Sequence, residues 1–226
     1  MSEFIEYTLN YRYRKSIKIE VKENEEIIIT APINCSKEEV DKLIQKKKKW
    51  ILDKIDIIRN REKLNKDEIL YLGDKKKVKI NVQKYIKREF VVYDNDTFII
   101  NVKNEENIIK IIKRYFNKEL SEIIKERINI YQGYFVEIPK KISIRDMKSI
   151  WGSCSRDNSL SFNLKLIMAP IEVIDYVIIH EMCHMKEKNH SKKYWSEVGK
   201  ILPDYQKEDC WLKDKAYLLH FLHLQP

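Results

Sequence analysis

Five consecutive residues, His-Glu-Met-Cys-His at positions 180–184, combine the side chains that bind and use a divalent metal ion. The apolar residues before them recur at helical spacing, which predicts an α-helix through this run. On a helix, His180 and His184 lie about 6 Å apart along the axis and about 40° apart around it, so both can bind one ion. Glu181 lies beside them, where its carboxylate can accept a proton from a metal-activated water without binding the metal. The pattern predicts a metal-dependent hydrolase with Glu181 as general base.

His190 is the candidate third ligand. It follows His184 by six residues, and a continuous helix would carry it by about 240° to the far side. We therefore expect the helix to end first, near Asn189, which tolerates left-handed backbone, and a new helix to be capped by Ser191. Three neutral imidazoles with one open position are typical of a catalytic zinc site. Glu208 is an alternative third ligand, although a solvent-facing role is favoured for it.

Other residues near the histidines have both functional and structural interpretations. Cys183 lies close to His180 around the helix and could be an extra ligand, but a role in the core is favoured. The second ring nitrogen of a metal-binding histidine normally donates a hydrogen bond. The candidate acceptors are Asp175, Glu197 and Asp204.

The spacing of the histidines matches the metzincin string H-E-x-x-H-x-x-G-x-x-H except that Glu187 replaces the glycine. No methionine follows His190, so the methionine turn of metzincins is also missing from the sequence. These two differences argue against a metzincin.

The elements that must position these residues are a mixture of strands and helices. A helix is expected from Ser36, which forms a capping box with Glu39, to about Arg61; others are expected at 105–131 and from Pro170 through the histidines. Alternating or β-branched apolar residues predict strands at 16–21, 27–30, 69–72, 78–82, 89–93, 98–102, 141–145, 150–155 and 160–163. The prediction is an α+β protein whose first hundred residues are rich in strand.

Composition limits the class of protein. The chain has 226 residues, of which 43% are hydrophobic, so it can bury a core and is not a disordered segment. It has neither an apolar run long enough for a membrane span nor a secretory signal, and its four cysteines form no C-x-x-C pair. We expect a cytoplasmic protein with free thiols and no membrane partner. His220 and His223, near the C-terminus, fit a packed terminal helix better than a site.

Additional motifs surround the histidines. They are the run 151–155 (WGSCS), 160–163 (LSFN), Ala169-Pro170, 173–177 (VIDYV), 189–191 (NHS), Tyr194-Trp195, Arg145-Asp146 and 203–205 (PDY), with looser matches around Pro32 and Trp50. Together with the histidines, these motifs resemble the YgjP-like metallopeptidase family, a relative of the SprT and WLM zincins. Tyr194 stands where the family usually has phenylalanine, so the aromatic ring is kept.

This resemblance implies a minimal zincin fold, with a twisted, antiparallel-rich sheet packed on the active-site helix and a β-rich N-terminal region. It also implies one Zn²⁺ ion held by His180, His184 and His190, with Glu181 as general base. We expect a single domain over residues 1–226, with the β-rich region and its one helix at 1–102 and the zinc catalytic region at 103–226.

The leading functional hypothesis is a zinc metallopeptidase that acts on a protein or peptide. Trp151, Asn163 and Tyr194 are candidate substrate-binding residues, and the strand that follows Trp151 could pair with an extended peptide. The net charge of +9 leaves two alternatives open. One is a metal-dependent hydrolase of nucleotide triphosphates, and the other is a basic module that binds DNA and contains a structural zinc. A DNA-associated protease would combine the first hypothesis with the last.

Overall fold

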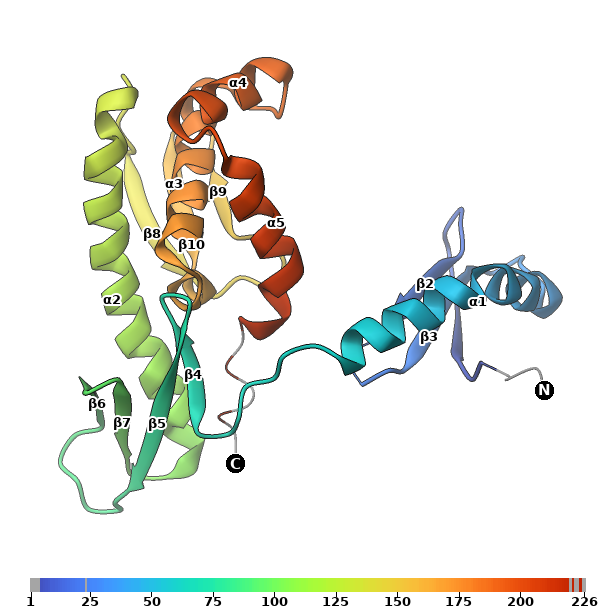
Figure 1. Ribbon diagram of the computed structural model, residues 1–226, viewed down its shortest axis with the longest axis horizontal. Coiled ribbons are helices and arrows are strands. Elements are labelled where there is room, and N and C mark those ends of the chain that lie inside the picture. The colour runs from blue at the N-terminus through green and yellow to red at the C-terminus, as the bar shows by residue number, and fades with distance from the viewer. Residues whose placement is uncertain (1–4, 23, 220, 222–223, 225–226) are drawn as a thin grey trace. The chain divides into compact units, whose positions relative to one another are not determined.

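The computed structural model (Figure 1) describes residues 5–22, 24–219, 221 and 224. His220 and His223, expected in a terminal helix, therefore lie outside the described residues. The chain divides into two compact units, Met1–Glu62 and Lys63–Pro226. The expectation of a single domain over residues 1–226 stays a prediction.

In the first unit, residues 5–22 and 24–62 form a three-stranded sheet and one helix. Its strands are β1 (Thr8–Arg12), β2 (Lys18–Val21) and β3 (Ile27–Pro32), in the order β1-β3-β2, and its helix is α1 (Lys37–Arg59). The predicted capping box starts α1, with Ser36 accepting from the Glu39 N–H and the Glu39 carboxylate accepting from the Ser36 N–H. Buried residues of β3 and α1 form the core of this unit. Strand β1 was not predicted, because its largely exposed residues carry no alternating apolar pattern.

The described residues of the second unit form two sheets and four α-helices. One sheet has the order β4-β5-β7-β6 and the other β8-β10-β9. The strands are β4 (Glu68–Tyr71), β5 (Asp74–Val82), β6 (Phe90–Asp94), β7 (Thr97–Val102), β8 (Lys141–Arg145), β9 (Gly152–Cys154) and β10 (Ser159–Asn163). The helices are α2 (Ile108–Tyr131), α3 (Ile171–Lys186), α4 (Lys192–Ile201) and α5 (Tyr205–Lys215), with 3₁₀ turns at Glu105–Asn107, Gln132–Tyr134, Leu164–Met168 and Ala216–Leu218. The protein is α+β, as predicted.

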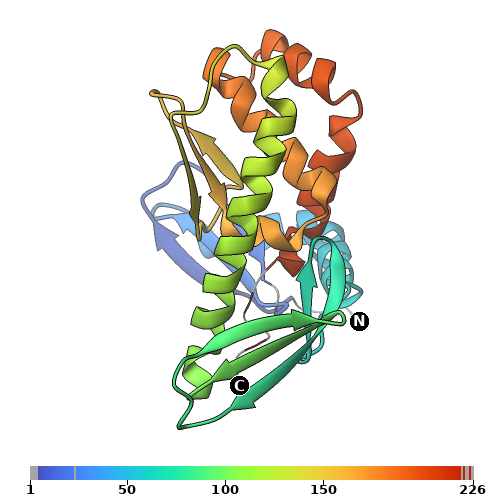
Figure 2. The same ribbon diagram turned by 90° about the vertical axis from the view of Figure 1, so that its left-hand side faces the viewer.

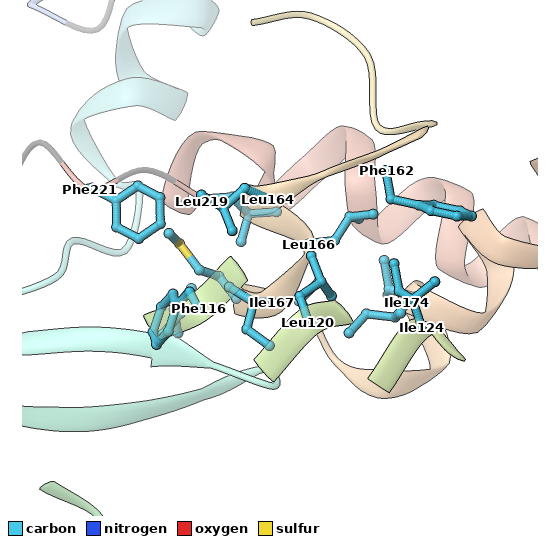
Figure 3. Close-up of a cluster of buried hydrophobic side chains, with 14 of the residues drawn as sticks. Phe116, Leu120, Ile124, Phe162, Leu164, Leu166, Ile167, Ile174, Leu219 and Phe221 are labelled. Carbon is cyan, nitrogen blue, oxygen red and sulfur yellow. The ribbon is translucent and has the colours of Figure 1, made fainter. Parts of the chain in front are cut away.

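Helix α2 connects the two sheets of this unit. It packs against β6 and β7 of the four-stranded sheet and against β8 of the other sheet (Figure 2), and it also contacts α3. Its apolar residues recur at helical spacing and face the core, where Phe116, Leu120 and Ile124 are fully buried with Phe162 of β10 and Ile174 of α3 (Figure 3). The helix that carries the histidines is therefore seated on a continuous apolar core.

An ion pair fixes α3 to α2. The Arg127 guanidinium of α2 binds both carboxylate oxygens of Asp175 on α3, and the Tyr131 hydroxyl donates to the same carboxylate at 2.8 Å. Asp175 is buried, so its charge depends on these partners. The pair holds the first turns of α3 in place.

Each sheet contains one parallel pair of strands, together with one antiparallel pair in the three-stranded sheets and two in the four-stranded sheet. The parallel pairs are β1 with β3, β5 with β7, and β8 with β10. Apolar alternation identifies the buried face of a strand but not the direction of its neighbour, so the sequence did not predict these pairs. Among the described residues, no helix has both the length and the apolar character that a membrane crossing needs.

Candidate metal centre

Three histidine side chains meet at one point in the second unit. His180 and His184 lie one turn apart on α3, and His190 follows the end of that helix. The His190 Nε2 lies 3.1 Å from the Nε2 of His180 and 3.1 Å from that of His184, and one ligand atom from each ring lies within 4.8 Å of the others. Tetrahedral zinc with bonds of about 2.0–2.1 Å separates its nitrogen ligands by about 3.3 Å, so this spacing fits one ion.

The chain reverses between His184 and His190, as the spacing predicted. Helix α3 ends at Lys186, Glu187 is extended, and the Ser191 hydroxyl caps α4 by accepting from the Tyr194 N–H at 3.3 Å. Asn189 does not adopt the left-handed backbone that it could tolerate. Instead, the Ser191 N–H donates to the Asn189 carbonyl at 2.9 Å in a tight three-residue turn.

The surroundings of the rings suit metal binding. The His184 Nδ1 lies 2.9 Å from the Glu187 carbonyl; because a carbonyl only accepts, Nδ1 carries the proton and Nε2 keeps a free lone pair. Burial lowers the pKa of His180 to about 4 and also lowers that of His184. Both rings are therefore neutral near pH 7, the form that binds a metal. The residues present fit a metal ion.

Aromatic side chains support the histidines from behind. The Tyr194 ring stacks on His184 with centroids 4.4 Å apart, and Trp195 stacks on His190 at 5.5 Å. The Tyr194 hydroxyl donates to the His180 carbonyl at 2.9 Å. These contacts restrict the ring orientations before any ion binds.

Glu181 is buried beside the histidines, with 5% of its surface exposed. Burial raises the pKa of its carboxyl to about 8. The β9 backbone approaches it closely at Gly152, where a Cβ would lie 2.6 Å from both the Cγ and the Oε1 of Glu181. A larger residue at this position would require the Glu181 side chain to shift, so glycine allows β9 to pack directly against the carboxyl. This role of Gly152 was not predicted from the sequence. The feature that could have indicated it is that Gly152 belongs to the 151–155 motif.

A cavity of about 670 Å³ contains these groups. Its wall includes the three histidines and Glu181, Trp151 and β9, Tyr176 and Val177 of α3, and Leu212 of α5. Trp151, a predicted substrate-binding residue, thus faces the same space as the histidines. The cavity is large enough for a stretch of peptide and a side chain.

Asn163 and Tyr194, also predicted to bind substrate, do not line this cavity. The Asn163 side-chain amide is 2% exposed and donates to the carbonyls of Met147 and Ile150 at 3.0 and 2.8 Å, so it holds the loop that leads to Trp151. Tyr194 is fully buried behind the histidines. That these two residues contact substrate stays a prediction. In the structure, Asn163 contacts the loop before Trp151, and Tyr194 contacts the metal-binding histidines.

Two of the carboxylates predicted as partners of the ligands have other contacts. Asp175 binds Arg127, Glu197 pairs with Lys186 and Lys200, and His184 uses a backbone carbonyl instead. Within the described chain, the buried Nδ1 of His180 has no hydrogen-bond partner. Cys183 is buried in the cluster of α3 and α4, and neither it nor Glu208 belongs to the histidine group.

The chain is similar to known proteins in sequence and in structure. The model of the family described as "YgjP-like, metallopeptidase domain" matches residues 15–215. A crystal structure of the metallopeptidase zymogen of Pyrococcus abyssi, abylysin, is similar at 22% identity and a TM-score of 0.36, over 42% of this chain and 94% of that one. No curated protein matches the chain significantly.

Proposed function

Because the chain belongs to the YgjP-like metallopeptidase domain family, as its motifs predicted, we propose that it is a zinc-dependent peptidase. In this proposal, His180, His184 and His190 hold one Zn²⁺ ion and Glu181 is the general base. The observation that supports it most is the convergence of three imidazoles beside a buried carboxyl in one cavity. Three histidines leave one zinc position open, which distinguishes a catalytic site from a closed structural one.

In the proposed reaction, the bound metal and Glu181 have different roles. Bound zinc supplies a Lewis acid that polarises the scissile carbonyl and lowers the pKa of water. Glu181 accepts the proton of the attacking water and delivers it to the leaving amine. Its pKa of about 8 describes the metal-free site; a cation nearby favours the carboxylate and lowers that pKa toward the range a general base needs.

Strand β9 is suited to orient a peptide. It is the last strand in the order β8-β10-β9, so one edge pairs with β10 and the other has no partner strand among the described residues. Gly152, Ser153 and Cys154 of β9 all line the cavity. An extended peptide that pairs with this edge would pass over Glu181 and the histidines.

The cavity lining favours a peptide over a nucleotide triphosphate. Its two lysines already have partners: the Lys188 Nζ donates to the Ser155 carbonyl and the Asn158 side chain, and Lys213 pairs with Asp209. A triphosphate needs several free cationic groups or oriented N–H donors. The basic excess of the chain is therefore not concentrated at the proposed reaction site.

The test is the Glu181→Gln variant, with Glu172→Gln as the matched control. Both residues lie on α3, but Glu172 is exposed in its first turn. With a fluorescently labelled denatured protein as substrate, Glu181→Gln should keep its zinc and lose on the order of 10²–10⁴ in turnover. Glu172→Gln should match the wild type. Full activity of Glu181→Gln with zinc bound would rule out the assigned base.

A further inference from the structure

Apolar side chains from several elements line the cavity. Val177 and Tyr176 lie one helical turn before Glu181 and His180 on α3, which places them about 6 Å along the axis from the reacting groups and on the same face. Leu212 and Ala216 line the cavity from α5, which packs against α3, and from the turn after it. Ile150 and Trp151 line it from the loop before β9. We call Ile150, Trp151, Val177, Leu212 and Ala216 the apolar subsite.

The polar groups that α3 and α5 contribute near Val177 and Leu212 already have partners. The Tyr176 hydroxyl lies 3.3 Å from Asp209 Oδ1, and Lys213 lies 2.5 Å from Asp209 Oδ2. Asp209 and Lys213 thus balance each other's charge, and Lys213 extends into solvent with 70% of its side chain exposed. A charged substrate side chain near Val177 and Leu212 would lose water without gaining an unpaired partner.

We propose that the apolar subsite binds an aliphatic or aromatic side chain next to the scissile bond, so that the enzyme cleaves beside large apolar residues. The inference rests on the proposed peptidase function and adds its substrate class. Residues of an extended peptide are about 3.3 Å apart, so the backbone of a residue adjoining the cleaved bond lies within one such spacing of the reacting groups. A large side chain extends farther than its backbone and can therefore reach a subsite about 6 Å away. Removing such a side chain from a hydrophobic pocket should lower kcat/KM by about 10–200-fold.

The experiment uses the full-length, zinc-loaded protein and a library of unstructured peptides, with cleavage sites read by mass spectrometry. The wild type should cleave beside Leu, Met or Phe at least about 10-fold faster than beside Ala, Asp or Lys. Two variants then change the volume of the subsite in opposite directions. Val177→Ala should raise the Phe-to-Leu ratio of kcat/KM, and Ala216→Leu should lower it.

The ratio for two peptides on one enzyme preparation is unaffected by partial unfolding, because both rates fall together. Ile130→Ala removes a half-exposed apolar side chain of α2 outside the cavity and should leave the ratio unchanged. If zinc-dependent cleavage occurs without an apolar preference, or if both subsite variants keep the wild-type ratio, the subsite is wrong while the peptidase function stands. If the folded, zinc-loaded protein cleaves no peptide, the proposed function fails, and the subsite with it.

Discussion

Replacement of Gly152 by alanine tests the contact between β9 and the general base. The nearest atoms to a Cβ at this position all belong to Glu181, at 2.6, 2.6 and 2.9 Å. Gly152 does not have positive φ, so its backbone tolerates alanine and any effect arises from the contact alone. Carbon atoms prefer separations of about 3.5–4.0 Å, so the methyl group would overlap the carboxyl by close to 1 Å.

Two measurable effects follow from this overlap. Overpacking a buried site costs about 1–3 kcal/mol, which lowers Tm by about 2–12 °C in a chain of this size. Glu181 must also move, and a general base displaced by about 1 Å loses on the order of 10²-fold in rate. The zinc content should not change, because no histidine is among the contacting atoms.

The assay combines kcat/KM on a peptide, a thermal scan and zinc analysis of Gly152→Ala. The matched control is Gly133→Ala, where a Cβ would have no atom within 4 Å, and this variant should behave as the wild type. The reasoning is refuted if Gly152→Ala keeps both wild-type activity and wild-type Tm. Loss of zinc from this variant would also contradict it, since the contact would then act on the ligands.

Three other perturbations test the supports of the site. Tyr194→Phe removes one hydrogen bond to the His180 carbonyl but keeps the ring on His184, so it should lower the free energy of unfolding by about 1 kcal/mol and retain zinc. Tyr194→Ala should lower the free energy of unfolding by about 3–5 kcal/mol, measured by thermal or denaturant unfolding, and weaken zinc binding. Equal zinc affinity in the two variants would contradict this reasoning. Arg127→Met leaves Asp175 buried without its cation and should lower the free energy of unfolding by about 3–5 kcal/mol, whereas a change under about 1 kcal/mol would show that the pair does not hold α3. Burial raises the pKa of Glu181 from 4.5 to about 8, so this carboxyl should make the metal-free wild type less stable as pH rises from about 4.5 to 8, an effect that Glu181→Gln lacks. With chelator present, the Tm of the variant minus the Tm of the wild type should therefore increase over this pH interval. A constant difference would contradict the assignment.

The sequence predicted the parts of the site that follow from spacing along one helix. His180, Glu181 and His184 have fixed geometry once the helix is recognised. The position of His190 was predictable because, on a continuous helix, it would lie on the far side from the ion. The chain therefore had to reverse direction before His190 for it to bind the same ion. The capping box at Ser36 was predictable for the same local reason.

The rest depends on contacts between distant segments, which no local pattern specifies. Gly152 faces Glu181 only because β9 packs on α3. Asn163 holds the loop before Trp151 rather than lining the cavity, and this depends on the turn that the loop adopts. The apolar subsite requires α5 to pack against α3, an arrangement that residue spacing along the chain does not determine.

The most direct test of the central claim is the metal content of the purified protein, measured by elemental analysis beside His190→Ala and the control Lys192→Ala. Lys192 begins α4 next to the third ligand but is exposed and outside the histidine group. We predict one zinc ion per chain in the wild type and in Lys192→Ala, and a substoichiometric amount in His190→Ala under the same conditions. Stoichiometric zinc in His190→Ala, or no zinc in the wild type after reconstitution, would contradict a centre built from three imidazoles.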